Sequence, residues 1–506
     1  MDPTRTPIVE PLSHLERRFE SVRAKIGLAA APLLFLWVLW RPLTGLTTEA
    51  HRLAAVMSAV IMLWVTEALP MPMTALLGAA ACVALGVAPA REVFAPFADQ
   101  LMFLFIGSFI LARAIFLNGL DRRFAFGVLS LKWVGPRPGR ILFAFGAVTA
   151  FISAWISNTA TTAMMFAIGM SIIGFLVENE QHGGSPFNRR YATGLMLMTS
   201  FAASIGGLAT PVGTPPNLIG LGYIREQLHV EYSFFSWSLI GVPVVLCLFA
   251  ILFSYLYWLC PAGVRRIEGS DEMLARQKAS LGPWTTAQRS TLAAFGVTVV
   301  LWLTPGIIGF AAGEDSPAYQ AVSRRMPEAF AALVGAGLLF LLPGQQGRKA
   351  ITWDEAAHID WGVVLLYGGG FAFGILANKT GLAEAAGQAL IAWLPMRGGF
   401  GLVVAATIVA TVVSEATSNT ASANIVVPVV IALSQAAHVD PLEPALAATM
   451  ASSLGFMLPV STPCNAIVYG SGYVPLTRMI RYGLLLDLGG IVVIITLVRV
   501  LVPLVR

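Results

Sequence analysis

Long apolar runs separated by short polar or charged segments dominate this sequence. An α-helix needs about 20 predominantly apolar residues to cross the hydrocarbon layer of a bilayer, so the runs predict an all-α polytopic membrane protein with about eleven transmembrane helices. The expected spans are about 26–43, 52–69, 73–89, 100–119, 190–228, 235–260, 290–312, 327–343, 361–378, a tenth span broken at 461–465, and 482–503.

Two further apolar runs, 141–176 and 400–435, are interrupted by polar residues at Ser157 and Ser418. Each arm of the first run has about 16 residues, which is short for a complete span. Polar groups at membrane depth are costly unless they are buried in protein or line a wet cavity. We therefore expect two re-entrant hairpins whose tips, at 157–159 and 418–420, face a binding site.

The polar interruptions occur twice. Ser-Asn-Thr-Ala stands at 157–160 and again at 418–421, 261 residues later. A second break that contains Thr-Pro-X-Asn follows at 213–217 and at 461–465, 248 residues apart. Such duplication is typical of transporters that bind their substrate between repeats. We expect an inverted repeat, with a first half at 26–260, a cytoplasmic loop at 261–289 and a second half at 290–506.

Composition and charge support this class. Of the 506 residues, 57% are apolar and 12% are charged, and the mean hydropathy is +0.75, which lies outside the range of soluble domains. The net charge of +5 indicates topology rather than nucleic-acid binding. We expect the N-terminus on the cytoplasmic side of the inner (plasma) membrane, because Lys and Arg gather in segments assigned to that side: 1–25, 122–140, 189–190, 265–289 and 478–481.

Other classes of function have less support. The cysteines lack metal-ligand spacing, and the first 25 residues have no apolar core with a cleavage site, so we expect no removable signal peptide. The sequence has no His-Glu-X-X-His motif and no pair of aspartates expected to be buried, so an enzyme is not expected. Two occluding hairpins also suit alternating access better than a continuous pore.

The hairpin tips offer ligands for both an anion and a cation. Helix ends present free N–H groups to an anion, while unwound carbonyls favour cations. Asn158 and Asn419 carry a donor and an acceptor each. No Arg or Lys lies within four residues of either tip, so bound cations are expected to offset an anionic substrate. Glu67, Arg113 and Lys379 are expected to be structural. Glu415 either hydrogen-bonds the hairpin backbone or takes a proton.

The duplicated Ser-Asn-Thr-Ala, the Thr-Pro-X-Asn breaks and the turn at 66–72 resemble the divalent anion/sodium symporter family. The resemblance covers about residues 30–500, and INDY-type members carry dicarboxylates, citrate or sulfate. It implies eleven spans and two opposed hairpins, a homodimer in membrane lipid, and an elevator-like movement of a transport domain against a scaffold.

The resemblance also assigns residues. The first sodium site would use Ser153, Ser157, Asn158 and the backbone near Gly213; the second would use Ser414, Thr417, Asn419 and the backbone near Ser461. Substrate carboxylates would contact Ser157, Asn158, Thr159, Ser418, Asn419 and Thr420, with Thr214, Thr462 and Pro463 closing the cavity. The sequence departs from the family at Cys464, where proline is common, and at Ser414, where threonine is frequent.

The expected function is sodium-coupled symport of a divalent anion, with a four-carbon dicarboxylate such as succinate as the favoured substrate and Na⁺ as the coupling ion. The alternative is a sodium-independent exchanger of di- or tricarboxylates on the same scaffold. Sodium dependence separates the two. Because Cys464 neighbours Thr462 and Pro463, its thiol is expected to face the cavity rather than lipid.

Overall fold

The computed structural model describes residues 14–43, 45–181, 186–313, 315–393 and 398–505. Within these ranges the regular structure is α-helical, apart from one short 3-10 helix and one isolated bridge between Pro343 and Lys349. Ten helices in the described part of the chain are long and apolar enough to cross a membrane. Residues 1–13 of the expected cytoplasmic segment 1–25 lie outside the described residues, and so do residues 394–397 of the expected second half.

Helices cover all the predicted spans. Unbroken spans correspond to α1 (His14–Trp40), α2 (Thr48–Thr66), α3 (Met71–Ala84), α5 (Gln100–Leu117), α11 (Phe234–Leu259), α13 (Thr286–Ala312), α15 (Glu328–Leu341), α17 (Trp361–Thr380) and α23 (Leu476–Val505). The broken spans are α9 (Arg189–Gly206) with α10 (Pro215–Leu228), and α21 (Leu442–Ala451) with α22 (Pro463–Tyr469). Connecting helices are α4 (Ala90–Phe94), η1 (Ala95–Ala98), α6 (Leu120–Leu129), α12 (Ser270–Ser280), α14 (Pro317–Arg325), α16 (Trp353–Ala356) and α18 (Leu382–Trp393).

Both interrupted runs form helix pairs that break at the expected residues. The first pair is α7 (Pro138–Ser153) and α8 (Asn158–Gln181), and the second is α19 (Gly399–Ala416) and α20 (Asn419–Ala436). The expected short arm occurs only in α7, with 16 residues; α8 has 24, and α19 and α20 have 18 each. α8 is longer because Glu and Gln in 178–181 continue the helix past the apolar run. Arm length therefore does not support re-entrance.

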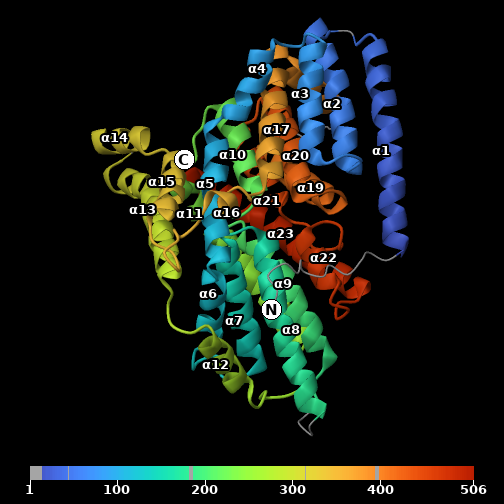
Figure 1. Ribbon diagram of the computed structural model, residues 1–506. Helices are drawn as coiled ribbons and strands as arrows, with labels where there is room; N and C mark the ends of the chain where they lie inside the picture. The colour runs from blue at the N-terminus through green and yellow to red at the C-terminus, as the bar shows by residue number, and fades with distance from the viewer. Residues whose placement is uncertain (1–13, 44, 182–185, 314, 394–397, 506) are drawn as a thin grey trace.

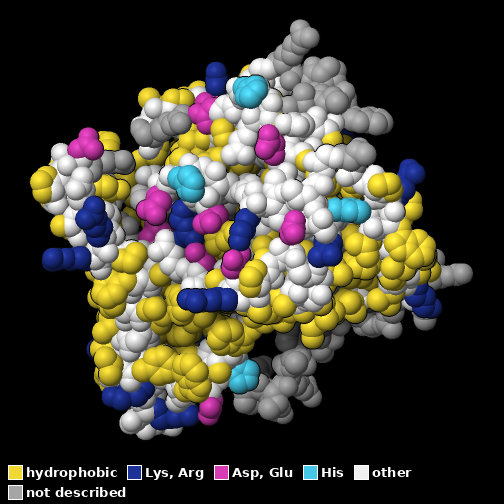
Figure 2. Space-filling view, turned by 90° about the horizontal axis from the view of Figure 1, so that it is seen from above, with side chains coloured by type: hydrophobic (Ala, Val, Ile, Leu, Met, Phe, Trp, Pro, Cys, Tyr) yellow, Lys and Arg dark blue, Asp and Glu magenta, His cyan; other side chains and the backbone are white. Residues whose placement is uncertain are grey.

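The two pairs extend in opposite directions from the middle of the molecule. α7 and α8 reach toward the end that also holds α6 and α12, whereas α20 lies beside α17 in the other half (Figure 1). α9 is central, since all of its residues from Tyr191 to Gly206 are buried. Figure 2 shows charged side chains near the middle of one face and hydrophobic side chains along much of its margin, as expected when lipid surrounds a protein.

Segments with predicted cytoplasmic placement meet at one end. The Ile267 N–H donates to the Pro136 carbonyl, and the Asn188 N–H donates to the Ala262 carbonyl, both at 2.7 Å. These bonds join parts of the basic segment 122–140, the polar loop before α9 and the loop 261–289. α12, from the last of these, lies at the same end as α6 and the start of α7 (Figure 1). The charge pattern and the packing thus group the same segments together.

Close packing of α9 against α7 gives a stability prediction. A Cβ added at Gly206 would lie 2.2 Å from the Ala150 carbonyl oxygen and 2.6 Å from its Cα, so the neighbouring backbone would have to move. We expect Gly206→Ala to lower the midpoint of thermal unfolding of the purified protein, through a loss of ~1–3 kcal/mol. Gly174→Ala in α8, where a Cβ meets nothing within 4 Å, is the matched control. Equal midpoints for the two variants would contradict this packing.

Candidate functional site

The first hairpin tip is held by its own polar side chains. The Ser153 hydroxyl, at the end of α7, donates to Asn158 Oδ1 at 2.8 Å, and Asn158 Nδ2 lies 3.5 Å from Thr214 Oγ1. Ser157 Oγ accepts from the Ala160 N–H at 3.3 Å and so caps the start of α8. The amide of Asn158 is therefore oriented, with its oxygen toward α7 and its nitrogen toward the first break.

The second tip repeats this arrangement. Ser414 Oγ lies 2.9 Å from Asn419 Oδ1 and 2.7 Å from the Ser452 carbonyl, and can donate its single proton to either. Ser418 Oγ accepts from the Ala421 N–H at 3.2 Å and caps α20. Two contacts thus occur at both tips: a serine hydroxyl beside the amide oxygen, and a serine cap at the start of the following helix.

Two buried asparagines hold the breaks after α9 and α21. Asn217 Nδ2 donates to the carbonyls of Gly207 and Thr210, each at 2.8 Å. Asn465 Nδ2 donates to the carbonyls of Gly455 and Leu458, at 3.0 and 2.9 Å. In both breaks the carbonyls precede the asparagine by ten and seven residues. The Asn of each Thr-Pro-X-Asn motif thus donates hydrogen bonds to backbone carbonyls that have lost their helical partners at the break.

Each tip amide lies against a glycine of the neighbouring break. A Cβ on Gly207 would lie 2.5 Å from Asn158 Oδ1, and a Cβ on Gly213 would lie 2.5 Å from the Gly207 carbonyl oxygen. In the second half, a Cβ on Gly455 would lie 3.1 Å from Asn419 Oδ1 and 3.3 Å from Ser414 Oγ. Oxygen atoms of the hairpin therefore lie against a break glycine in both halves, and in the first half the Gly207 carbonyl oxygen of the break joins them.

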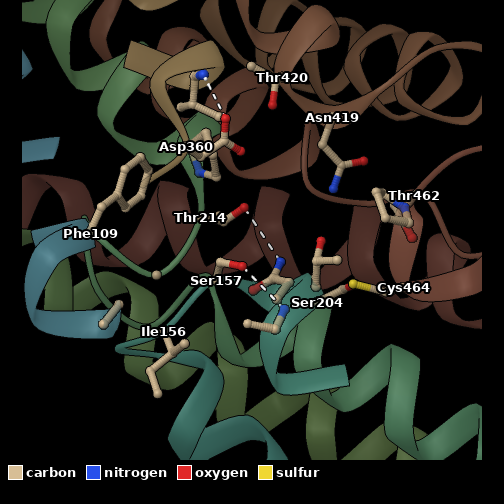
Figure 3. Close-up of a pocket in the computed structure, with 18 of the residues that line it drawn as sticks. Phe109, Ile156, Ser157, Ser204, Thr214, Asp360, Asn419, Thr420, Thr462 and Cys464 are labelled. Carbon is tan, nitrogen blue, oxygen red and sulfur yellow. Dashed lines mark hydrogen bonds between the residues drawn. The ribbon is translucent and has the colours of Figure 1, made fainter. Parts of the chain in front are cut away.

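A cavity of about 690 Å³ lies between the tips and the breaks. All nine residues that the sequence assigns to substrate line it: Ser157, Asn158, Thr159, Thr214, Ser418, Asn419, Thr420, Thr462 and Pro463. In Figure 3, Ser157 and Thr214 face the cavity from one side, and Asn419, Thr420 and Thr462 from the other. The structure brings the two halves of the predicted site together.

The residues assigned to sodium divide into two groups. Ser157, Asn158, Gly213, Asn419 and Ser461 line the cavity. Ser153, Ser414 and Thr417 are buried behind it. Ser153 and Ser414 contact the tip amides, whereas the Thr417 hydroxyl donates to the Val413 carbonyl at 2.7 Å. The described residues contain no cluster of three His, Cys, Asp or Glu side chains, and the possible cation ligands at the tips and breaks are amide, hydroxyl and carbonyl oxygens.

Ionisable residues that the tip sequences do not reveal also line the cavity: Arg113 of α5, and His358 and Asp360 between α16 and α17. The Nε of Arg113 is buried without a hydrogen-bond partner among the described residues. Asp360 Oδ1 accepts from the Val363 N–H at 3.2 Å and caps α17. Bound cations were expected to offset an anionic substrate because no Arg or Lys stands near either tip in the sequence, but the folded chain also brings Arg113 to the same cavity.

Glu415 forms hydrogen bonds with the second break. One carboxylate oxygen accepts from the Met457 N–H at 2.7 Å and the other accepts from the Ser461 hydroxyl at 2.7 Å. Asp487 of α23 is buried beside it. Of the two expected roles, hydrogen bonding is observed, although the partner backbone belongs to the break between α21 and α22 rather than to the hairpin. Glu415 thus fixes Ser461 relative to α19.

Broken helices around a polar cavity, in a helical membrane protein, define the class of solute transporters with a central binding site. The chain belongs to the sodium:sulfate symporter family, since the family described as the sodium:sulfate symporter transmembrane region matches residues 23–505. This confirms the family that the duplicated motifs indicate.

Individual proteins resemble the chain along nearly its full length. The sodium-dependent dicarboxylate transporter SdcS of Staphylococcus saprophyticus is 31% identical over 495 residues, covering 96% of this chain and 93% of that protein. SdcS of Staphylococcus aureus is 30% identical over 487 residues, covering 95% and 91%. The crystal structure of the YdaH transporter of Alcanivorax borkumensis superposes with a TM-score of 0.53 over 96% of this chain and 98% of that one. The two sequences are 13% identical, so the comparison shows a shared fold.

Cys464 provides a test of the cavity. Its thiol lies beside Ser204 in Figure 3, and the residue lines the cavity, as predicted for a position that faces the cavity rather than lipid. In a variant with Cys82, Cys247 and Cys260 replaced by serine, we expect succinate and sodium together to slow labelling of Cys464 by a small thiol reagent. A variant that keeps only the exposed Cys247 is the control. Labelling of Cys464 that ignores both solutes would contradict the placement of the second break.

Proposed function

We propose that this protein is a secondary active transporter that couples Na⁺ to the uptake of a divalent anion, with a four-carbon dicarboxylate such as succinate as substrate. The observation that carries the proposal is the convergence of two Ser-Asn-Thr tips on one cavity, each with its amide oxygen against a break glycine. The names of the SdcS relatives, sodium-dependent dicarboxylate transporters, agree with it.

The two crowded groups of oxygen atoms are the proposed sodium sites. The first comprises Ser153, Ser157, Asn158 and the backbone at Gly213, and the second comprises Ser414, Thr417, Asn419 and the backbone at Ser461. Small hard cations take oxygen ligands, and neutral oxygens supply them here at low cost in desolvation. Glu415 supports the second site indirectly, because its carboxylate holds the Ser461 hydroxyl.

The proposed anion site lies between the sodium sites. The helices α8 and α20 begin at Asn158 and Asn419, so their free N–H groups face the cavity and favour a carboxylate. Ser157, Thr159, Ser418 and Thr420 add hydroxyl donors, with Thr214, Thr462 and Pro463 forming the adjoining wall. A dicarboxylate suits this arrangement because it has two carboxylates, one for each tip.

The resemblance to the family carries the remaining parts of the proposal: an inverted repeat of 26–260 and 290–506, re-entrant hairpins, an elevator-like movement and a homodimer. The opposite directions of the two hairpins and the matched contacts at their tips support the repeat. The common end shared by the basic loops supports one cytoplasmic face. The placement of the N-terminus on that side of the inner membrane follows from the Lys and Arg residues of 1–25.

Arg113 favours a second candidate function. A fixed guanidinium in the cavity offsets part of the charge of an anion without any sodium, as a sodium-independent exchanger of di- or tricarboxylates requires. One positive charge does not neutralise a dianion, and Asp360 lines the same cavity with the opposite sign. Coupling to sodium therefore remains the proposal that the oxygen groups support best.

The tip amides give a mutational test. We expect Asn158→Ala and Asn419→Ala each to lower initial succinate uptake by proteoliposomes at least about tenfold, because each removes a donor and an acceptor and leaves a buried serine hydroxyl without its amide partner. Asn378→Ala, which removes an exposed amide from the end of α17, is the matched control and should transport normally. Near-normal uptake by either tip variant would exclude that amide from the site.

Sodium dependence tests the coupling itself. We expect succinate uptake by proteoliposomes to require an inward sodium gradient and to stop when choline replaces sodium. The Asn378→Ala protein serves as a second active preparation for the same assay. Uptake that is unchanged in choline, but stimulated by succinate or citrate preloaded inside the vesicles, would overturn the symporter proposal and establish the exchanger.

A further inference from the structure

A second cavity, of about 720 Å³, lies where α7 begins and α11 ends. It shares no lining residue with the central cavity. Its walls come from the segment around the start of α7, from Tyr191 of α9, and from the end of α11 with the loop after it. Backbone hydrogen bonds of 2.7 Å join Ile267 to Pro136 and Asn188 to Ala262, and the Tyr191 hydroxyl donates to the Pro138 carbonyl at 2.9 Å. The cavity is therefore built by tertiary contacts between three segments far apart in sequence.

Three arginines line this cavity without acidic partners. They are Arg137, Arg140 and Arg265, and the described lining residues contain no Asp or Glu. None of the three takes part in an ion pair among the described residues. Arg140 donates to the Trp133 carbonyl at 2.8 Å and lies 5.5 Å above that ring, while Arg137 and Arg265 are exposed. Guanidinium groups without acidic partners can donate two parallel hydrogen bonds to the oxygens of a phosphate.

Aromatic side chains give the cavity an apolar floor and an exposed rim. The Phe253 ring packs against Phe143 at 5.2 Å and against Tyr257 at 5.7 Å between centroids. Tyr257 rests directly on α7, since a Cβ on Gly139 would lie 2.5 Å from its ring. At the rim, Trp258 is 77% exposed at the last turn of a membrane-spanning helix. Exposed Trp and Tyr at a span end are typical of the membrane interface.

We propose that this cavity binds an anionic phospholipid, with the headgroup phosphate at Arg137, Arg140 and Arg265 and the acyl chains along the apolar faces of α7 and α11. The charge favours a phosphate, and basic pockets between membrane helices on the cytoplasmic side are suited to acidic headgroups. The aromatic floor and the span-end position favour a lipid over a soluble anion, because a soluble anion gains nothing from apolar walls.

Native mass spectrometry of the purified full-length protein in an uncharged detergent tests the proposal. Dioleoyl phosphatidylglycerol and dioleoyl phosphatidylcholine differ in net headgroup charge but not in acyl chains. We expect the wild-type protein to bind the phosphatidylglycerol more tightly, and the Arg137→Gln/Arg265→Gln variant to lose affinity for it by about tenfold or more. No hydrogen bond of the described structure is broken by these two substitutions.

The matched control is Arg266→Gln/Arg276→Gln, which removes the same charge from nearby positions outside the cavity. Arg276 has a side-chain exposure of 83%. The control should bind phosphatidylglycerol like the wild-type protein. Equal affinity of the wild-type protein for the two lipids, or equal loss in both double variants, would overturn the proposal.

A third arm separates a lipid from a free anion. Inorganic phosphate and glycerol 3-phosphate carry the same anionic group without acyl chains, and we expect neither to displace phosphatidylglycerol at equal concentration. Displacement by either one would show a soluble-anion site instead. Should the glutamine variant fail to fold, Arg137→Lys/Arg265→Lys keeps the charge but loses the planar fork, and a smaller drop in phosphatidylglycerol affinity is then expected. Unchanged affinity in that variant would also count against the proposal.

Discussion

The central constraint on this structure is that backbone N–H and C=O groups at the helix breaks need hydrogen-bond partners. Unpaired N–H and C=O groups in hydrocarbon cost several kcal/mol each, so a broken helix survives only where protein or a wet cavity supplies partners. Asn217 and Asn465 supply two donors each to the breaks, and neither residue is exposed. A cavity among broken helices is a consequence of that arrangement, since the carbonyls left over must face something polar.

The binding geometry follows from the same constraint. Asn158 and Asn419 cannot rotate freely, because a buried serine contacts each amide oxygen. Their orientation brings the oxygens against Gly207 and Gly455, and in the first break the carbonyl oxygens of Gly207 and Ala154 lie close to Gly213. The oxygen atoms that could bind a cation thus lie between each tip and its neighbouring break. The helix N-termini and hydroxyl groups that could bind an anion face the cavity. One element of sequence, used twice, separates the two kinds of ligand without any charged side chain at the tips.

Sequence reasoning found what repeats in the chain and missed what does not. The duplicated letters identified Asn158, Asn419 and both breaks, and Gly207 and Gly455 stand at the same 248-residue offset as the breaks, so the repeat held a signal for them too. Arg113 was expected to be structural, and no repeated motif links it to the tips. α5 is apolar on nearly all sides, and only tertiary packing brings the Arg113 side of the helix to the cavity. The second arm of the first hairpin was underestimated because polar helix formers extend α8 beyond its apolar run.

Arg113 changes how the charge of a substrate is balanced. It belongs to α5, whereas the proposed sodium ligands belong to the hairpins and breaks, so fixed and exchangeable positive charge come from different elements. A dianion held by the tips alone would depend entirely on bound cations to offset its desolvation. With a guanidinium in the cavity, the strength of that dependence varies with how closely α5 approaches the tips. Any movement of the tips relative to α5 would therefore alter the sodium requirement for holding the anion.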